Sequence, residues 1–160
     1  MNRKNSILTI IILCVFTLFS IVGCSQNNES KEKELVSNFT KTFFTEPGDD
    51  MDIFKKYLTE TAYQSLTNDR YASSRIQYTP SIQGNMEGLE ISDLNIEPIE
   101  DENKDYHYYN VSFSLKDTKN DKSIEIQYKI SLEKEKNNWK IGMNNQFHLL
   151  TKSLWGIWEN

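Results

Sequence analysis

The chain has 160 residues and a formal charge of −5, from 18 basic and 23 acidic side chains. This acidic balance argues against a nucleic-acid partner, which needs a basic surface to bind phosphates, and against a surface that adheres to anionic lipid. The length is sufficient for one domain with a hydrophobic core.

The first segment has the composition of a secretory signal. Arg3 and Lys4 precede an uncharged, apolar run from Ile7 to Val22, as in signal peptides. A helix of this length would extend about 24 Å, whereas a stable transmembrane helix needs about 20 apolar residues. We predict that residues 1–23 are removed from the mature protein. The alternative is an uncleaved N-terminal membrane anchor.

The end of this segment resembles the bacterial lipobox, on the residues Ile21, Val22, Gly23 and Cys24. In proteins with this motif the cysteine receives a diacylglyceryl group, and the signal is cut just before it. The resemblance implies a lipoprotein that is tied to the lipid bilayer through acylated Cys24 and faces outside the cytoplasm. Cys14 would leave with the signal, so the mature domain would have neither a disulfide nor a free thiol.

The mature part would carry 16 basic and 23 acidic residues, a charge of −7. Residues 24–30 are polar and are predicted to form a tether. Residues 31–160 are predicted to form a single extracytoplasmic domain.

Helices are expected in the N-terminal half of this domain. The first runs from Lys31 to Phe44 with Ser30 as its cap, and it has an apolar stripe of Leu35, Val36, Phe39, Phe43 and Phe44. A second is expected from Asp50 to Leu58. A third, capped by Thr59, is expected to reach Asn68. The second and third could also be one kinked helix.

Residues 69–87 show no clear period and are predicted to form a long loop, with a short strand at Arg75–Tyr78 as an option. Loops of this length are often functional. Arginine and tyrosine often dominate binding energy, so we predict a candidate binding surface here, formed by Arg70, Tyr71, Arg75 and Tyr78. The alternative is an irregular linker whose arginines pair with the acidic surface.

From Leu89 onward the hydrophobic period is two, which predicts strands. The first strand has a one-residue slip at Ser92–Asp93, which predicts a β-bulge. Strands at Tyr106–Lys116, Ser123–Glu133 and Asn138–Phe147 alternate between apolar and polar residues, so we expect an antiparallel meander with one buried and one wet face.

A register can be proposed from the inward residues. The expected pairs are Phe113 with Ile126, Leu115 with Ile124, Val111 with Tyr128, Ile130 with Ile141, and Leu132 with Trp139.

The last segment, His148 to Asn160, is rich in leucine and aromatic residues. It is predicted to be a final strand or a short helix. Trp155 and Trp158 form a second candidate contact surface. The alternative is that they close the core.

The order of these elements resembles the nuclear transport factor 2-like (cystatin-like) superfamily. The similar parts are the helix around Phe39–Phe44, the helical stretch Phe54–Leu66 and the hairpins that end in Asn138–Ile141. The resemblance implies an α+β, cone-like fold with N-terminal helices packed on a curved antiparallel sheet of four or more strands. Small lipoproteins of Gram-positive bacteria look similar, and some conjugation-machinery domains share the fold. The superfamily includes enzymes and binding modules, so no residue roles carry over.

Candidate catalytic and metal-binding residues are few. His107 and His148 are interpreted as structural or exposed histidines. The acidic clusters Asp49–Asp50 and Glu100–Glu102 lack the spacing of a calcium loop and are interpreted as solvated charge. No phosphate-binding glycine loop and no Gly-x-Ser-x-Gly motif occurs. We therefore predict neither a metal nor a cofactor.

The sequence favours a membrane-anchored, non-enzymatic module that binds a protein or peptide of the cell envelope. The main alternative is a small-molecule-binding or isomerase-like domain that uses the interior of the cone. A purely structural spacer is a third. A filled interior would favour the first, and a cavity with convergent polar groups would favour the second.

Overall fold

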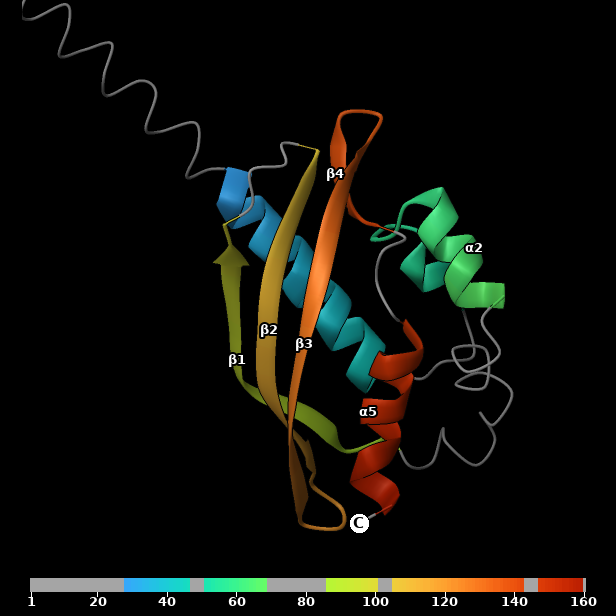
Figure 1. Cartoon of the computed structure of the whole chain (residues 1–160). Coiled ribbons are helices and arrows are strands. Elements are labelled where there is room, and N and C mark those ends of the chain that lie inside the picture. The colour runs from blue at the N-terminus through green and yellow to red at the C-terminus, as the bar shows by residue number, and fades with distance from the viewer. Residues whose placement is uncertain (1–27, 47–50, 69–85, 101–104, 143–146, 160) are drawn as a thin grey trace, which may run out of the picture. The chain divides into compact units, whose positions relative to one another are not determined.

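The structure is a computed structural model that describes residues 28–46, 51–68, 86–100, 105–142 and 147–159 (Figure 1). The chain divides into two compact units, Met1–Glu34 and Leu35–Asn160. Residues 1–27 lie outside the described part and include Cys24 and the predicted signal. Within the described ranges, no helix has the length and apolar character needed to cross a membrane.

In the first unit, residues 28–34 are helical. The predicted cap at Ser30 is wrong, because the helix already includes residue 28. Glu29 and Lys33 form an ion pair of 2.9 Å at helical spacing, which favours this earlier start.

In the second unit, residues 35–45 are helical. The predicted apolar stripe is confirmed, because four of its members are fully buried: Val36, Phe39, Phe43 and Phe44. Phe39 lies at the centre of an aromatic cluster, with ring centroids 6.0 Å from Phe54 and 6.4 Å from Phe147. Three segments distant in sequence therefore meet around this one side chain.

The predicted helix from Asp50 to Leu58 is wrong. Only a short 3-10 helix forms, η1 (Met51–Phe54); residues 55–57 then form a hydrogen-bonded turn, after which the chain pairs with the sheet. Ile141 donates its N–H to the Tyr57 carbonyl at 2.9 Å, and the Ile141 carbonyl accepts the Thr59 N–H at 3.0 Å. These bonds to a residue far along the chain override the local apolar spacing.

The following helix, α2 (Glu60–Asn68), agrees with the prediction. Thr59 caps it, because its Oγ1 accepts the Ala62 N–H at 3.2 Å. Ala62 and Leu66 of this helix are buried. The long loop predicted to follow lies at residues 69–85 outside the described part, as does the optional strand at 75–78.

The sheet has four antiparallel strands in the order β1-β2-β3-β4. They are β1 (Leu89–Ile99), β2 (Tyr106–Asp117), β3 (Lys122–Glu135) and β4 (Asn138–Ile141). The predicted bulge is confirmed by a register shift between Ser92 and Asn95, where Asp93 has a φ of 56°. The fourth strand was predicted too long, because Phe147 begins the last helix instead.

The predicted register is confirmed between β2 and β3, where Phe113 faces Ile126. It is wrong by two residues between β3 and β4, where Ile141 faces Leu132 rather than Ile130. A two-residue turn at Lys136 and Asn137, with φ of 49° and 67°, sets this register.

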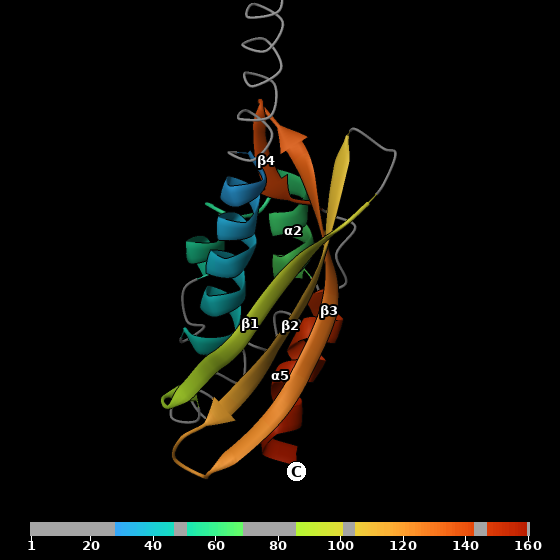
Figure 2. The ribbon, with the colours of Figure 1, turned by 90° about the vertical axis from the view of Figure 1, so that its left-hand side faces the viewer.

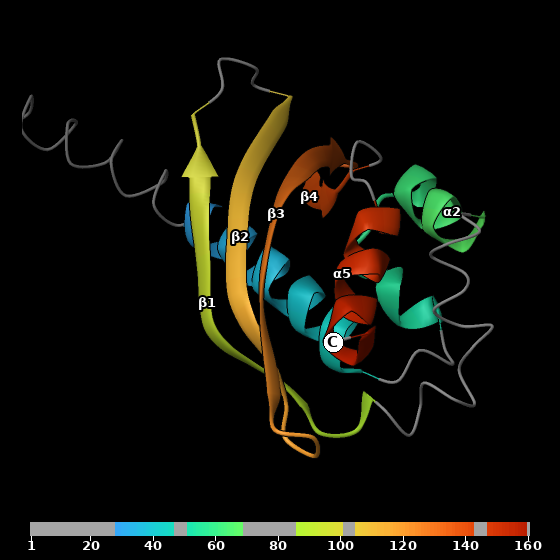
Figure 3. The ribbon, with the colours of Figure 1, turned by 60° about the horizontal axis from the view of Figure 1, so that its bottom comes forward.

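The C-terminal segment is a helix, α5 (Phe147–Glu159), which decides between the two predicted options. Among its described side chains, the buried ones are Phe147, Leu150, Thr151, Leu154 and Ile157. A Cβ added to Gly156 would lie 3.8 Å from Ile124 of β3, which places α5 on the inward face of the sheet. Figure 3 shows α5 and α2 on the same side of the curved strands.

Strand β1 is an edge strand, because among the described strands it pairs only with β2. Its exposed side chains include Glu90, Asp93 and Glu97, followed by Pro98. A bulge, charges and a proline are features by which natural edge strands resist pairing with another strand.

Candidate functional site

The candidate residues predicted from the sequence cannot be placed as a site. Arg70, Tyr71, Arg75 and Tyr78 lie outside the described residues. The backbone of Trp155 and Trp158 is part of α5, but their side chains, like that of His148, are outside the described set. These surfaces, and the acylation of Cys24, remain predictions.

The interior between sheet and helices is filled by apolar side chains in the described part of the chain. Its largest fully buried members include Phe39, Phe43, Phe44, Phe54 and Phe113. Phe44 of the first helix packs edge-on against Phe113 of β2, with ring centroids 4.9 Å apart. The aromatic rings therefore occupy the space that a ligand would need in a hollow cone.

One polar pair lies at the side of this interior, where Thr40 is buried and Tyr128 is partly buried. The Thr40 hydroxyl donates to the Val36 carbonyl at 2.8 Å and lies 2.6 Å from the Tyr128 hydroxyl. Because Thr40 has a single hydroxyl proton, Tyr128 is the donor in the second bond. Burial raises the pKa of the Tyr128 hydroxyl well above its ordinary value. The two groups satisfy each other, which is typical of a structural pair.

The outward face of the sheet has a different character. In Figure 2 the strands lie in front of α2 and α5, and the contacts of Phe44 and Gly156 place the helices on the inward face. The outward residues include a polar, mostly exposed set: Glu90, Asn95 and Glu97 of β1, Asn110, Ser112 and Lys116 of β2, and Ser123, Glu125, Gln127 and Lys129 of β3. Ser114 and Ser131 share this side of the sheet but are buried, and Ile99 pairs with Tyr108 there. We call the polar set, with Tyr106 and Tyr108, the outward face.

Pairing across the strands arranges this face in rows. Glu97, Asn110 and Lys129 form one row, with Asn110 in the middle. Asn95, Ser112 and Gln127 form the next, with Ser112 in the middle. Opposite charges therefore lie on the two outer strands of one row, about 10 Å apart at a strand spacing of about 4.8 Å. Among the described residues, neither Glu97 nor Lys129 forms an ion pair with a side chain.

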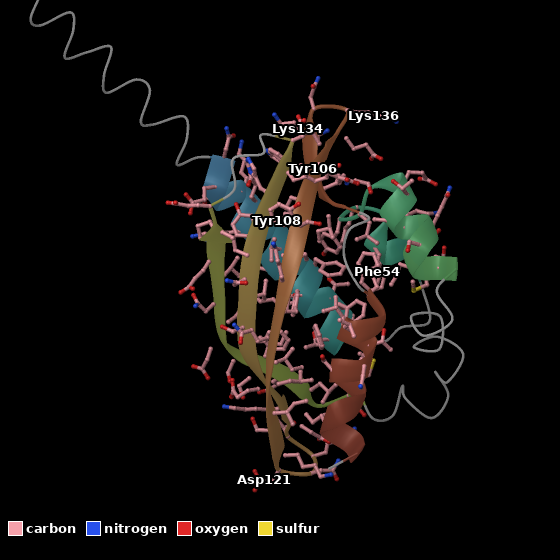
Figure 4. All side chains as sticks on the ribbon, viewed as in Figure 1. Phe54, Tyr106, Tyr108, Asp121, Lys134 and Lys136 are labelled. Atoms are coloured by element: carbon pink, nitrogen blue, oxygen red, sulfur yellow. The ribbon has the colours of Figure 1, made fainter. Side chains whose placement is uncertain are left out.

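Aromatic side chains occupy one end of this face. The rings of Tyr106 and Tyr108 stack at an angle of 25° with centroids 6.4 Å apart, and Lys129 Nζ lies 4.1 Å from the Tyr108 ring centre. Figure 4 shows both tyrosines toward the end of the sheet that carries Lys134 and Lys136, with Asp121 in the hairpin turn at the opposite end. Tyrosine rings with one exposed side are common in protein interfaces.

His107 faces the other side of β2. Its ring stacks on Trp139 of β4 at a centroid distance of 4.0 Å, and Lys134 Nζ lies 5.0 Å from the same Trp139 ring. His107 is therefore part of an aromatic contact that joins β2 to β4, in agreement with its interpretation as a structural residue. In the described ranges, no three histidine, cysteine or carboxylate side chains gather as metal ligands would.

Comparison with protein families matches residues 50–149 to the NTF2-like N-terminal transpeptidase domain. The match covers more than half of the chain and includes η1, α2, all four strands and the start of α5. The chain belongs to this family. The α+β fold and the resemblance to nuclear transport factor 2 are thereby confirmed. Comparison with curated proteins gives no match.

The name of the NTF2-like N-terminal transpeptidase domain family raises the question of a transpeptidase nucleophile. Penicillin-binding transpeptidases use a Ser-x-x-Lys motif together with Ser-Asp-Asn and Lys-Thr-Gly. Ser-x-x-Lys occurs here at Ser30–Lys33 and Ser131–Lys134, and the other two motifs do not occur in the 160 residues.

Neither pair has the arrangement that this chemistry requires. Ser131 and Lys134 lie on β3, where residues three apart point to opposite faces. Ser30 is exposed, and Lys33 is already paired with Glu29 at 2.9 Å.

The sequence alone did not single out the outward face, because alternating polar residues on strands are what any solvated sheet face shows.

Proposed function

We propose that this protein is a lipid-anchored accessory module at the outer face of the cytoplasmic membrane, which acts by binding an envelope protein or peptide rather than by catalysis. The observation that carries the proposal is the interior packed with aromatic rings around Phe39. An isomerase-like enzyme would need polar groups that converge on a cavity. The Thr40 and Tyr128 hydroxyls instead form a hydrogen bond with each other.

The family match guides the choice of partner. The family name associates such domains with transpeptidases, so a transpeptidase of the envelope is the first partner to test. The predicted binding surface is the segment with Arg70, Tyr71, Arg75 and Tyr78, and the second is the helix end with Trp155 and Trp158.

The anchor is tested by mass spectrometry of the full-length protein expressed in a bacterium that processes lipoproteins. Wild-type protein should lose residues 1–23 and gain a diacylglyceryl mass. Cys24→Ala should keep the signal and gain no acyl mass. Cys14→Ala is the matched control, because that thiol lies in the removed segment and its loss should change neither event. An acylated Cys24→Ala protein would contradict the anchor.

Catalysis is tested by labelling the membrane-bound protein with a fluorescent penicillin, which acylates transpeptidase nucleophiles. We expect no label, and a label lost in Ser30→Ala would support the enzymatic alternative.

Binding is tested by cross-linking in membranes. Arg75→Ala should remove the partner band, and Lys122→Ala, at the start of β3, should retain it. A band unchanged in Arg75→Ala would reject that surface.

A further inference from the structure

We propose that the outward face is a two-fold interface, through which two copies of this chain bind each other. The proposal goes beyond the partner-binding role, because it concerns a surface that the packed interior and the predicted loop do not use. It rests on the arrangement of charges and amides in the rows of the sheet.

The first argument is the symmetry of the charges. In one row Glu97 lies on β1 and Lys129 on β3, with Asn110 between them. A two-fold axis parallel to β2 and above Asn110 places β1 of one copy opposite β3 of the other. Glu97 then faces the partner's Lys129, and Lys129 faces the partner's Glu97. One pair of side chains in the monomer yields two ion pairs in the dimer, as an isologous interface requires.

The neighbouring row obeys the same symmetry. Asn95 on β1 and Gln127 on β3 flank Ser112, so the same axis places each amide opposite the partner's other amide. Amide side chains both donate and accept hydrogen bonds, which allows them to pair. The small Ser112 side chain on the axis lets the two sheets approach.

The residues on the axis itself meet their own equivalents. At one end these are Tyr106 and Tyr108, whose stacked rings can pack against the same rings of the partner, an arrangement that aromatic side chains favour. At the other end Lys116 would meet its equivalent, and Glu90 lies beside it in the same row. The like charges are therefore compensated within each copy.

Other modes of self-association fit less well. Strand addition at β1 is opposed by the bulge at Asp93 and by Pro98. An axis parallel to the strands also keeps Leu35, where the second unit begins, at the same end in both copies. Two chains related in this way can be tied to one bilayer, whereas an axis across the strands would point the two attachment ends in opposite directions.

The test is cross-linking of the full-length protein in membranes. Asn110→Cys places one thiol near the axis, so a short bismaleimide should join two copies. The matched controls are Lys136→Cys, in the turn beyond β3 that leads to β4 (Figure 4), and Lys152→Cys, on the exposed side of α5, which lies on the inward side of the sheet. Equal cross-linking at all three positions would mean random collision and would overturn the proposal.

Charge reversal then separates this interface from any other. In the Asn110→Cys background, Glu97→Lys and Lys129→Glu should each lower the cross-linked fraction about tenfold, because each sets like charges opposite one another. Co-expression of the two variants with different tags should restore cross-linking between them, since every contact is again of opposite sign. This rescue also shows that both variants fold. Failure of the mixed pair to cross-link above either variant alone would refute the two-fold interface, and the partner band of the Arg75 experiment would be unaffected.

Discussion

Replacing Tyr128 with phenylalanine should change the free energy of unfolding in opposite directions at pH 8 and at strongly alkaline pH. Tyr128→Phe removes the hydrogen bond to Thr40, 2.6 Å long, which should lower the free energy of unfolding at pH 8 by about 1 kcal/mol. Above about pH 10 the effect should shrink, and above about pH 11 it should reverse. The unfolded tyrosine ionises near its ordinary pKa of about 10, whereas burial keeps the native hydroxyl protonated because its pKa is raised.

The size of the reversal follows from proton linkage. Between the unfolded and the folded pKa, the native state binds one more proton than the unfolded state, so wild-type stability falls by about 1.4 kcal/mol per pH unit. The stabilisation is complete below pH 10 and is lost as the pH rises toward the raised pKa. The wild type should therefore lose its advantage over Tyr128→Phe near about pH 11, and the variant should be the more stable protein above that pH.

The assay is urea unfolding followed by tryptophan fluorescence at pH 8, 10, 11 and 11.5. Lysine titration affects both proteins and cancels in their difference. Thr40→Val is the matched control, because it removes the same hydrogen bond but leaves the Tyr128 hydroxyl in place, so it should keep the alkaline loss. A constant difference between wild type and Tyr128→Phe from pH 8 to 11.5 would show that this hydroxyl titrates as it does in water.

Three further predictions concern local contacts. Thr59→Ala should lower the free energy of unfolding by about 1 kcal/mol in urea titrations, because the first turn of α2 loses its cap. Gly142→Ala should destabilise the protein, because the new Cβ would lie 2.7 Å from the Glu133 side chain; in a Glu133→Ala background the same change should cost measurably less, and equal costs would disprove the clash. Hydrogen bonds, first of all from the Asn120 side chain, hold the pKa of Asp117 below its ordinary value. The stabilisation is therefore present above about pH 4 and is lost as the pH falls through the lowered pKa, so Asp117→Asn should be less stable at pH 7 and should show a weaker loss of stability in acid.

The sheet was largely predictable because its pattern is local and periodic. Alternation along β2 and β3 predicted which residues face inward, and opposing Phe113 to Ile126 sufficed for their register. The slip in β1 was visible because the inward parity changes after Ser92. Burial on one face imposes a period of two on every strand, so the sequence carries this information redundantly.

The register of β3 with β4 was not predictable from the same pattern. A shift of two residues keeps every side chain on its face, so Ile130 and Leu132 were equally good partners for Ile141. The turn between β3 and β4 sets their register, because Lys136 and Asn137 adopt positive φ there. Neither residue is glycine, so the turn gave only a weak signal in the sequence.

The helix predicted for the segment before α2 was wrong for a different reason. Met51, Phe54 and Leu58 have helical spacing, but the backbone after Phe54 pairs with Ile141. A local sequence pattern does not indicate which residue, more than 80 positions away, the backbone will pair with. The outward face was not predicted because its charge pattern appears only in rows that cross three strands. These rows can be drawn only when the register of the strands is known.

The start of α2 has a consequence for how the chain becomes a folded protein. The Thr59 hydroxyl donates to Glu133 at 3.0 Å and the Glu60 N–H to Glu135 at 3.0 Å, across 74 and 75 positions. A polypeptide that emerges from a ribosome or a secretion channel with its amino end first cannot make these bonds until the last hairpin has followed. The amino-terminal half must therefore wait in an incomplete state, and acquisition of the native state is deferred until the hairpin of β3 and β4 has been delivered.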